Sequence, residues 1–262
     1  MKILKSTLSL TFFLFAVLTL CVSVSAAEKP QIKVMTFNIH HAEGMDKVVD
    51  LARIAEIINK TAPDIAAIQE VDNKTERTSK IDQAAELGNL TKMQVSFGKA
   101  INFQGGEYGQ ILLHKPKLKS FETLQLPNQD KNEQRIALVA SLDNYKEIPP
   151  FTFIGTHLEN TSLTASLPQA QALVEKFGKT SPIIIAGDFN SNPNDQTIKF
   201  VSNTWADATS SIKNTFETEG KIDYIFYGCP DQWKVIECKL IDSGIASDHK
   251  AISVILEWQG KL

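Results

Sequence analysis

The chain has 262 residues, of which 43% are hydrophobic and 22% charged, and its formal net charge is −3. These proportions are those of an ordinary globular protein, and they exclude collagen-like, coiled-coil and wholly disordered chains. The mild excess of acid argues against a broad basic surface that coats nucleic acid, although a local nucleic-acid site is compatible with it.

The chain begins with a segment that is typical of a secretory signal peptide. Lys2 and Lys5 precede an apolar stretch, and small residues follow at 24–27. This pattern predicts that residues 1–26 are a cleaved signal peptide and that the protein is secreted or periplasmic. The alternative is a retained membrane anchor, because the apolar stretch is near the length that spans a bilayer. After cleavage we expect no membrane span, since no later apolar run is long enough.

Short apolar runs dominate the rest of the chain, and a few amphipathic helices separate them. One helix is expected at 46–60, with Asp46 as its N-cap. A second is expected at 81–90, opened by Ser79 and Asp82, and a third at 168–177, stopped by Gly178. Strands are expected at 32–39, 64–71, 110–114, 137–142, 151–157, 183–186, 222–227, 234–242 and 251–257.

The many strands and few helices predict a sheet packed on a sheet, with helices covering the outer faces. No repeat or linker-like stretch interrupts residues 27–262, so one domain is expected there. Two cysteines remain after the leader, Cys229 and Cys238, and they flank what we expect to be a hairpin. Their separation along that hairpin exceeds the reach of a disulfide, so we expect two unpaired thiols.

Polar side chains stand at the ends of six of the expected strands, where a sheet edge can hold a side chain rigidly. One such residue would mean little, but the whole set exceeds what turn chemistry requires. The residues are Asn38, Glu70, His157, Asp188 with Asn190, Asp223, and Asp248 with His249.

Carboxylate and amide oxygens suit a hard divalent cation such as Mg²⁺. Glu70 is the first choice of metal ligand, with Asn38 and Asp248 close by; taken alone, Glu70 could equally be a solvated strand end. His157 and His249 do not stand in HExxH-type spacing, and the two distant cysteines make no zinc site, so a zinc protease is disfavoured.

Asp188 and Asn190 lie two residues apart, so on an extended segment they point to the same side. The carboxylate could take a proton from water while the amide fixes the direction of that water. The alternative is an ordinary Asx-type turn before the following proline.

Two histidines and an arginine complete the candidate set. Asp223 could orient the imidazole of His249 and favour its charged form. His157, at another strand end, could instead be a packing residue. Arg135 could bind an anion with two hydrogen bonds, although most surface arginines do not.

In chain order these pieces resemble the endonuclease/exonuclease/phosphatase superfamily, the fold of pancreatic-type deoxyribonuclease, bacterial exonuclease III and neutral sphingomyelinase. The segments that match are TFNIH, IQEV, GGEYG, EQR, THL, GDFN, KIDYIF and SDH, from about residue 33 to the C-terminus. The chain is most similar to compact secreted bacterial members that carry NIHH, IDQAAEL and GGEYG, in which the stretch around Arg77, Asp82 and Gln83 recurs. Gln134, Gln110 and Pro168 depart from the usual pattern, outside the metal and water residues.

The resemblance implies an α+β fold: a four-layer α/β/β/α sandwich of two packed mixed β-sheets with outer helices. It implies an exported, Mg²⁺- or Mn²⁺-dependent hydrolase of phosphate esters, most simply a monomeric phosphodiesterase, that uses metal-assisted in-line attack of water. The alternative is a non-catalytic phosphate- or nucleic-acid-binding module that retains the fold.

The resemblance also distributes roles among the candidate residues. Glu70, Asn38 and Asp248 would hold the metal, and Asp188, directed by Asn190, would activate water. His249, oriented by Asp223, and His157 would donate hydrogen bonds to the phosphoryl oxygens. Tyr108, Arg135, Asn38 and Arg77 would hold the phosphate.

The substrate stays open between nucleic acid and a lipid or small phosphodiester. The notable basic cluster is Lys115, Lys117 and Lys119. Alternation puts these three lysines on one side of a strand or loop. A solvated strand edge, whose charges discourage pairing with other strands, is a simpler interpretation of them than a nucleic-acid-binding surface.

Overall fold

The computed structural model describes residues 29–128, 132–161, 165–216 and 220–260. The expected signal peptide at 1–26 therefore lies outside the described residues. Among the residues that are described, no helix combines the length and apolar character needed to cross a bilayer.

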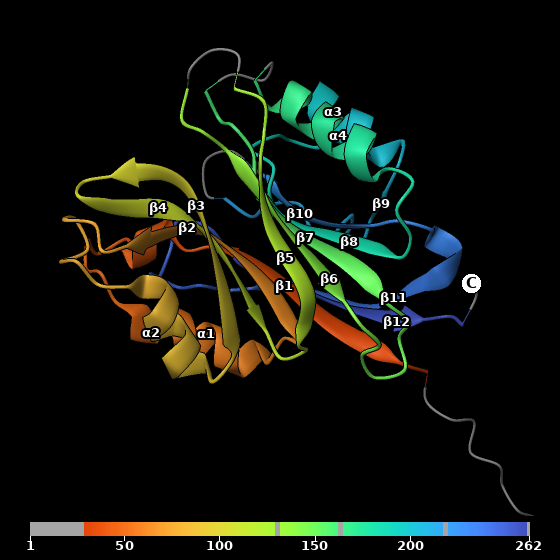
Figure 1. Cartoon of the computed structure of the whole chain (residues 1–262), viewed down its shortest axis with the longest axis horizontal. Coiled ribbons are helices and arrows are strands. Elements are labelled where there is room, and N and C mark those ends of the chain that lie inside the picture. Colours follow the sequence, from red (N-terminus) through yellow and green to blue (C-terminus); the bar gives the residue numbers. More distant parts are fainter. Residues whose placement is uncertain (1–28, 129–131, 162–164, 217–219, 261–262) are drawn as a thin grey trace, which may run out of the picture.

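Two six-stranded sheets pack face to face (Figure 1). The first contains, in spatial order, β11 (Trp233–Ile241), β12 (Ala251–Trp258), β1 (Gln31–Asn38), β2 (Ile65–Asn73), β4 (Gly106–His114) and β3 (Gln94–Phe103). The second contains β5 (Leu118–Gln125), β6 (Ile136–Leu142), β7 (Phe151–His157), β8 (Ile183–Asp188), β10 (Asp223–Tyr227) and β9 (Ala206–Asp207). Both sheets are mixed, because β1 pairs with β2 and β7 with β8 in parallel while the other described pairs are antiparallel.

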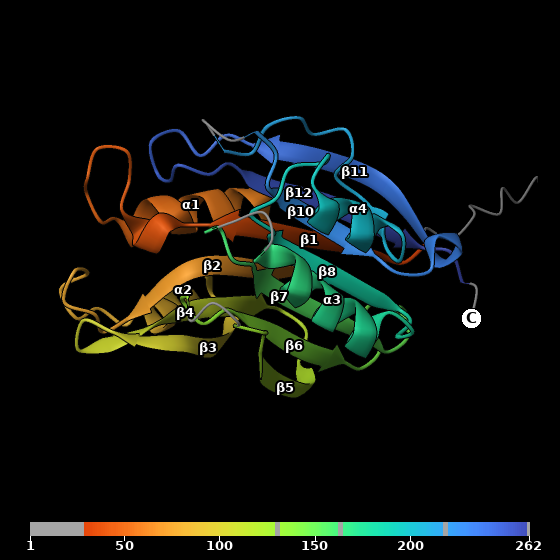
Figure 2. The same cartoon turned by 90° about the horizontal axis from the view of Figure 1, so that it is seen from above.

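Helices cover the two outer faces of this sandwich (Figures 1 and 2). Helices α1 (Leu51–Thr61) and α2 (Gln83–Thr91) pack on the first sheet, where they bury one apolar cluster. Helices α3 (Ser166–Phe177) and α4 (Gln196–Ser202) pack on the second sheet over another. A third cluster fills the space between the sheets. The expected four-layer α/β/β/α sandwich is therefore confirmed.

Alternation along each strand decides which side chains face the partner sheet. In β1, Ile32 and Val34 belong to the inter-sheet core, whereas Met35 and Phe37 lie under the helices. Each such fully buried aliphatic or aromatic side chain stabilises the fold by roughly 1.5–3 kcal/mol.

The same alternation carries polar residues into the end of the space between the sheets. Asn38 continues the inward-facing positions of β1, and His157 continues those of β7. Asp188 and Asp223 do the same for β8 and β10, where they stand opposite each other in the ladder. The apolar core thus ends in a polar cluster to which both sheets contribute.

The first helix begins later than the sequence pattern predicts. Its N-cap is Asp50, whose Oδ1 accepts hydrogen bonds from the backbone N–H groups of Ala52 and Arg53 at 2.9 and 3.3 Å. Asp46 was therefore the wrong cap: it forms an ion pair with Arg53 at 2.9 Å from a turn closed by the bridge between Glu43 and Val49. The second N-cap is Asp82, whose Oδ1 accepts from the N–H of Ala85 at 3.0 Å. The expected capping box opened by Ser79 was therefore wrong: Asp82 caps the helix itself instead of standing within its first turn.

The two cysteines are unpaired thiols, as expected, but the hairpin between them was wrong. Strand β10 belongs to the second sheet and β11 to the first, so the short 3₁₀-helix η2 (Pro230–Gln232) and its flanks carry the chain from one sheet to the other.

Candidate functional site

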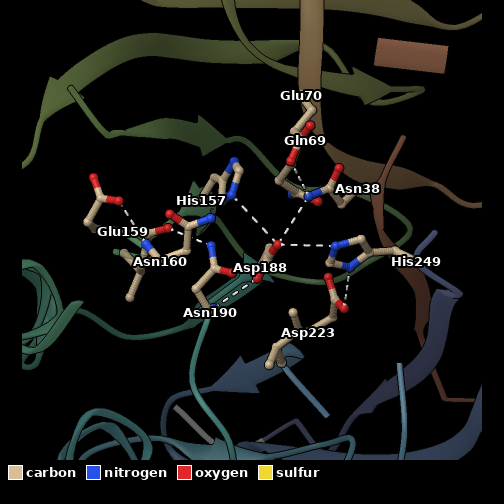
Figure 3. A network of polar contacts seen from close by, with 12 residues as sticks. Asn38, Gln69, Glu70, His157, Glu159, Asn160, Asp188, Asn190, Asp223 and His249 are labelled. Atoms are coloured by element: carbon tan, nitrogen blue, oxygen red, sulfur yellow. Dashed lines mark hydrogen bonds and ion pairs between the residues drawn. The ribbon is translucent and has the colours of Figure 1, made fainter. Parts of the chain in front are cut away.

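The Asp188 carboxylate is the centre of the polar cluster between the sheets (Figure 3). It ends β8, is only 1% exposed, and its Oδ2 accepts a hydrogen bond from Asn38 Nδ2 at 3.1 Å. The Nε2 atoms of His157 and His249 lie 3.6 and 3.7 Å from the same oxygen. One amide and two imidazoles thus converge on a single carboxylate oxygen.

Burial and the nearby Asp223 charge raise the pKa of Asp188 to about 7. The other oxygen of Asp188 accepts the backbone N–H of Asn190 at 2.8 Å, and the Asn190 side chain donates to the carbonyl of Leu158 at 2.8 Å. Asp188 and Asn190 thus form an Asx-type turn and also lie in the polar cluster, so the two alternatives for this segment do not exclude each other. Asn190, at φ 47°, holds Asp188 through its backbone and keeps its own carboxamide beside it.

His249 is held by Asp223, as the sequence predicts. The distance from His249 Nδ1 to Asp223 Oδ2 is 3.0 Å, which leaves Nε2 directed at Asp188. Burial lowers the pKa of His249, but the charge and hydrogen bond of Asp223 outweigh this effect and raise it to about 10. The ring of Phe216 packs on the imidazole at 4.6 Å between centroids. His249 is therefore a fixed imidazolium at neutral pH.

His157 differs from His249 because it is neutral. Burial, and next the Arg135 charge, hold the pKa of His157 well below its usual value. Arg135 Nη1 lies 3.2 Å from His157 Nδ1. The same Nη1 also lies 3.4 Å from His157 Nε2, so this contact alone does not fix the tautomer. Nε2 also faces the Asp188 carboxylate, and we therefore assign the ring proton to Nε2 and the acceptor role toward the guanidinium to Nδ1.

Arg135 is buried in a network of charges rather than exposed to a ligand. It is 6% exposed, and its guanidinium pairs with Glu133 at 2.9 Å and Glu159 at 3.6 Å. Its expected role as a phosphate-binding group stays a prediction. Its contact with His157 also allows it to fix the orientation of that imidazole.

Glu70 reaches the site because β2 contains a bulge. Ile68 pairs with Ile111 and Val71 with Gly109, so Gln69 and Glu70 both stand opposite the single residue between them in β4. Glu70 takes φ 59°, a strained conformation for a residue with a side chain. The extra residue turns the Glu70 carboxylate toward Asn38, whose Nδ2 donates to Glu70 Oε1 at 2.9 Å.

The groups around Glu70 fit a divalent cation. Glu70 is half-buried, and the Asn38 carboxamide beside it keeps a free lone pair although its Oδ1 accepts the backbone N–H of His40 at 3.1 Å. Oxygen donors of this kind are the usual ligands of Mg²⁺ and Mn²⁺. Asp248, the third expected ligand, is half-buried, and its Oδ1 accepts from Ser247 Oγ at 3.3 Å. The single Ser247 hydroxyl proton is shared with the carbonyl of Asn38, which at 2.8 Å is the nearer acceptor.

Arg77 and Tyr108 lie together on the Glu70 side of the site. Arg77 donates two hydrogen bonds to the buried Asp72, at 2.7 and 2.8 Å, and its guanidinium lies over the rings of Phe103 and Tyr108. Burial, and next the negative charge of Glu70, raise the pKa of Tyr108 well above its usual value. Tyr108 is therefore a permanent hydroxyl that can donate a hydrogen bond.

Some residues beside the site were missed by the analysis of the sequence. His40 and His41 form the 3₁₀-turn η1 (His40–Ala42) directly after β1, and each offers a nitrogen near the Glu70 carboxylate. The paired histidines after a strand-end asparagine were the available signal. Glu159 was also missed; it is 2% exposed and lies beside Arg135. The available signal was its position two residues after the strand-end His157.

The fold and this site define a sheet-on-sheet α/β sandwich with a carboxylate–imidazole centre between its sheets. Residues 35–249 match the model of the endonuclease/exonuclease/phosphatase family. The chain therefore belongs to this family, whose enzymes hydrolyse phosphate esters.

Solved structures share the fold at low sequence identity. A protein of this family from Beutenbergia cavernae is 21% identical, with a TM-score of 0.77 over 88% of this chain and 72% of that one. The human nocturnin catalytic domain with bound sulfate is 22% identical, with a TM-score of 0.71 over 88% and 94%. A mannosyl-6-phosphatase of Bacteroides thetaiotaomicron is 18% identical, with a TM-score of 0.71 over 87% and 100%. No curated protein matches the sequence.

Proposed function

We propose that the protein is a divalent-metal-dependent phosphodiesterase that activates water with Asp188. The observation that carries this proposal is the convergence of Asn38 Nδ2, His157 Nε2 and His249 Nε2 on Asp188 Oδ2. A raised pKa suits Asp188 to general-base catalysis near neutral pH. Membership of a family of phosphoester hydrolases supports the same reaction.

The two imidazoles have different parts in this mechanism. The imidazolium of His249, fixed by Asp223, donates through Nε2 and carries a positive charge toward the oxygens of a bound phosphate. The neutral His157 donates through Nε2 without charge. In this proposal both donors are held in advance near the phosphate oxygens on which charge develops, and such preorganisation is the main requirement of phosphoryl transfer.

Glu70 and Asn38 would hold the cation, with Asp248 in the adjoining loop. A divalent cation bound there would supply positive charge to neutralise the phosphate and its leaving group. Tyr108 and Arg77, on the Glu70 side, would bind the remaining part of the ester. Export through the leader at 1–26 is part of the proposal, and the mature N-terminus of secreted protein would test it.

The reaction is tested with a panel of phosphate esters and added Mg²⁺ or Mn²⁺. The panel contains an aryl phosphodiester, supercoiled plasmid, phosphocholine and inositol-phosphate diesters, and phosphomonoesters including a sugar 6-phosphate. Cleavage of a diester that is lost in Asp188→Asn supports the proposal. A panel in which only monoesters are cleaved would replace the phosphodiesterase with a phosphatase, and no cleavage at all would leave a phosphate-binding module.

A further inference from the structure

A second group of metal-binding side chains lies beside the Asp188 network. His40, His41 and Glu70 each offer one ligand atom, and these three atoms all lie within 4.8 Å of one another. The histidines come from η1 after β1, and Glu70 from the bulge of β2. Glu70 also joins this group to Asn38 through the 2.9 Å hydrogen bond.

Glu43 lies beside both imidazoles and orients that of His40. His40 Nδ1 lies 3.2 Å from the backbone oxygen of Glu43, and His41 Nε2 lies 3.7 Å from its carboxylate. A carbonyl oxygen can only accept, so the proton of neutral His40 is on Nδ1 and its Nε2 has a free lone pair. Metal-binding histidines are typically held in this way, with the nitrogen that does not bind the metal donating to an oxygen.

His41 supplies an independent observation. Its side chain is buried, with 7% of the residue exposed, and its Nδ1 has no hydrogen-bond partner among the described residues. Buried polar atoms are nearly always satisfied, so an unpartnered nitrogen beside a carboxylate and a second imidazole is an atom available to bind a ligand. With Nε2 facing Glu43, Nδ1 is the atom that remains for a metal.

The backbone is strained to bring these groups together. His40, His41 and Ala42 have φ of 46, 43 and 60°, and Glu70 has φ of 59°. Three successive left-handed residues with side chains are uncommon, and such strain persists where the surrounding structure enforces it.

We propose that His40, His41 and Glu70 bind a transition-metal ion of the Mn²⁺, Co²⁺ or Zn²⁺ class in preference to Mg²⁺. Two imidazoles with one carboxylate are a donor set for first-row transition metals, whereas Mg²⁺ selects oxygen ligands. The inference rests on the proposed function in one respect. Glu70 belongs both to this group and to the proposed cation site, so the inference names the class of metal ion that the proposed site would hold.

Metal binding is measured on the full mature chain after removal of metals, with Co²⁺ and Mg²⁺ alone as probes. We expect calorimetry to give a Kd for Co²⁺ at least about 10-fold below that for Mg²⁺. His40→Gln and His41→Gln should each weaken Co²⁺ binding at least about 10-fold and leave Mg²⁺ binding within about 2-fold. His114→Gln is the matched control, because His114 is buried between Ser96 and the carbonyl of Pro116, and it should bind Co²⁺ like the parent protein.

A measurement on the unaltered chain covers the case in which a histidine variant does not fold. Substoichiometric Mn²⁺ should broaden the imidazole NMR signals of His40 and His41 while the His114 signals stay sharp. Equal affinity for Co²⁺ and Mg²⁺, Co²⁺ binding unchanged in both variants, or uniform broadening of all imidazole signals would each overturn the inference. Because these readouts do not involve hydrolysis, a chain that binds Co²⁺ through these histidines but cleaves no ester would contradict only the proposed function.

Discussion

Asn38 and Asp188 belong to opposite sheets, yet the Asn38 carboxamide donates a hydrogen bond of 3.1 Å to the Asp188 carboxylate. The same amide nitrogen donates to Glu70 at 2.9 Å. Asn38 thus connects the proposed metal side of the site to the proposed water-activating side. Both carboxylates accept a hydrogen bond from this one amide nitrogen, so their positions are coupled.

Asp188→Asn should lower the rate of ester hydrolysis at least about 100-fold, because the amide cannot accept a proton from water. It should not destabilise the metal-free fold at pH 8. The folded-state pKa of about 7 exceeds the ordinary value of 3.8, so the ionised carboxylate reduces stability progressively as pH rises between these values. Thermal unfolding with and without the substitution checks this, and a lower Tm of the variant would contradict it.

The rate should depend on pH with two limbs. It should rise as Asp188 loses its proton near pH 7 and fall as His249 loses its proton near pH 10. These limbs belong to the interacting pair as a whole. Asp223→Asn removes the charge that raises both pKa values, so both limbs should move to lower pH. If both limbs of the pH–rate profile stay at the same pH in Asp223→Asn, Asp188 and His249 do not determine the pH dependence of the reaction.

Arg135→Lys should lower kcat about 10-fold or more while KM changes little, since a lysine keeps the charge but loses the planar contact that positions His157. If Arg135 instead binds the phosphate, KM should rise. Steady-state kinetics on an aryl phosphodiester separates these roles. Lys176→Arg, an exposed position that pairs with Glu122, is the control and should leave both constants unchanged.

Glu70→Gln should weaken the activating cation at least about 10-fold, measured as the metal concentration for half-maximal rate. Chelation should abolish hydrolysis by the parent protein, and added Mg²⁺ or Mn²⁺ should restore it. Glu56→Gln is the control, because Glu56 lies exposed on α1 and pairs only with Lys60 in the described ion pairs. If Glu70→Gln and Glu56→Gln need the same metal concentration for half-maximal rate, Glu70 is not a ligand of the activating metal.

Much of the site could be predicted because the polar strand ends follow the inward alternation of apolar strands. Asn38, His157, Asp188 and Asp223 each continue positions that are apolar in the same strand. What alternation cannot reveal is the bulge at Glu70, since an extra residue shows only when the partner strand is known. The left-handed turn at His40 was missed for another reason, because no glycine marks it in the sequence.

Of the four edge strands, β11 was predicted, whereas β3, β5 and β9 were missed. Strands β3 and β5 are half-buried or exposed along most of their length, so their polar residues hide the apolar pattern. Helix α4 is too short for its periodicity to be recognised. Arg135 could be located but not assigned, because its burial against Glu133 and Glu159 is a tertiary property. Lys119 does lie on an edge strand, as expected for a solvated basic cluster.

The order in which the strands are synthesised has a consequence for when the protein can act. The middle of the chain builds the second sheet, whereas the first sheet is completed only by β11 and β12. His249 stands just before β12, which must pair with β1 to bring the imidazole to Asp188. A nascent chain that ends before residue 249 therefore lacks its positive imidazole, so the ribosome-bound intermediate should be catalytically silent until translation of the last strand.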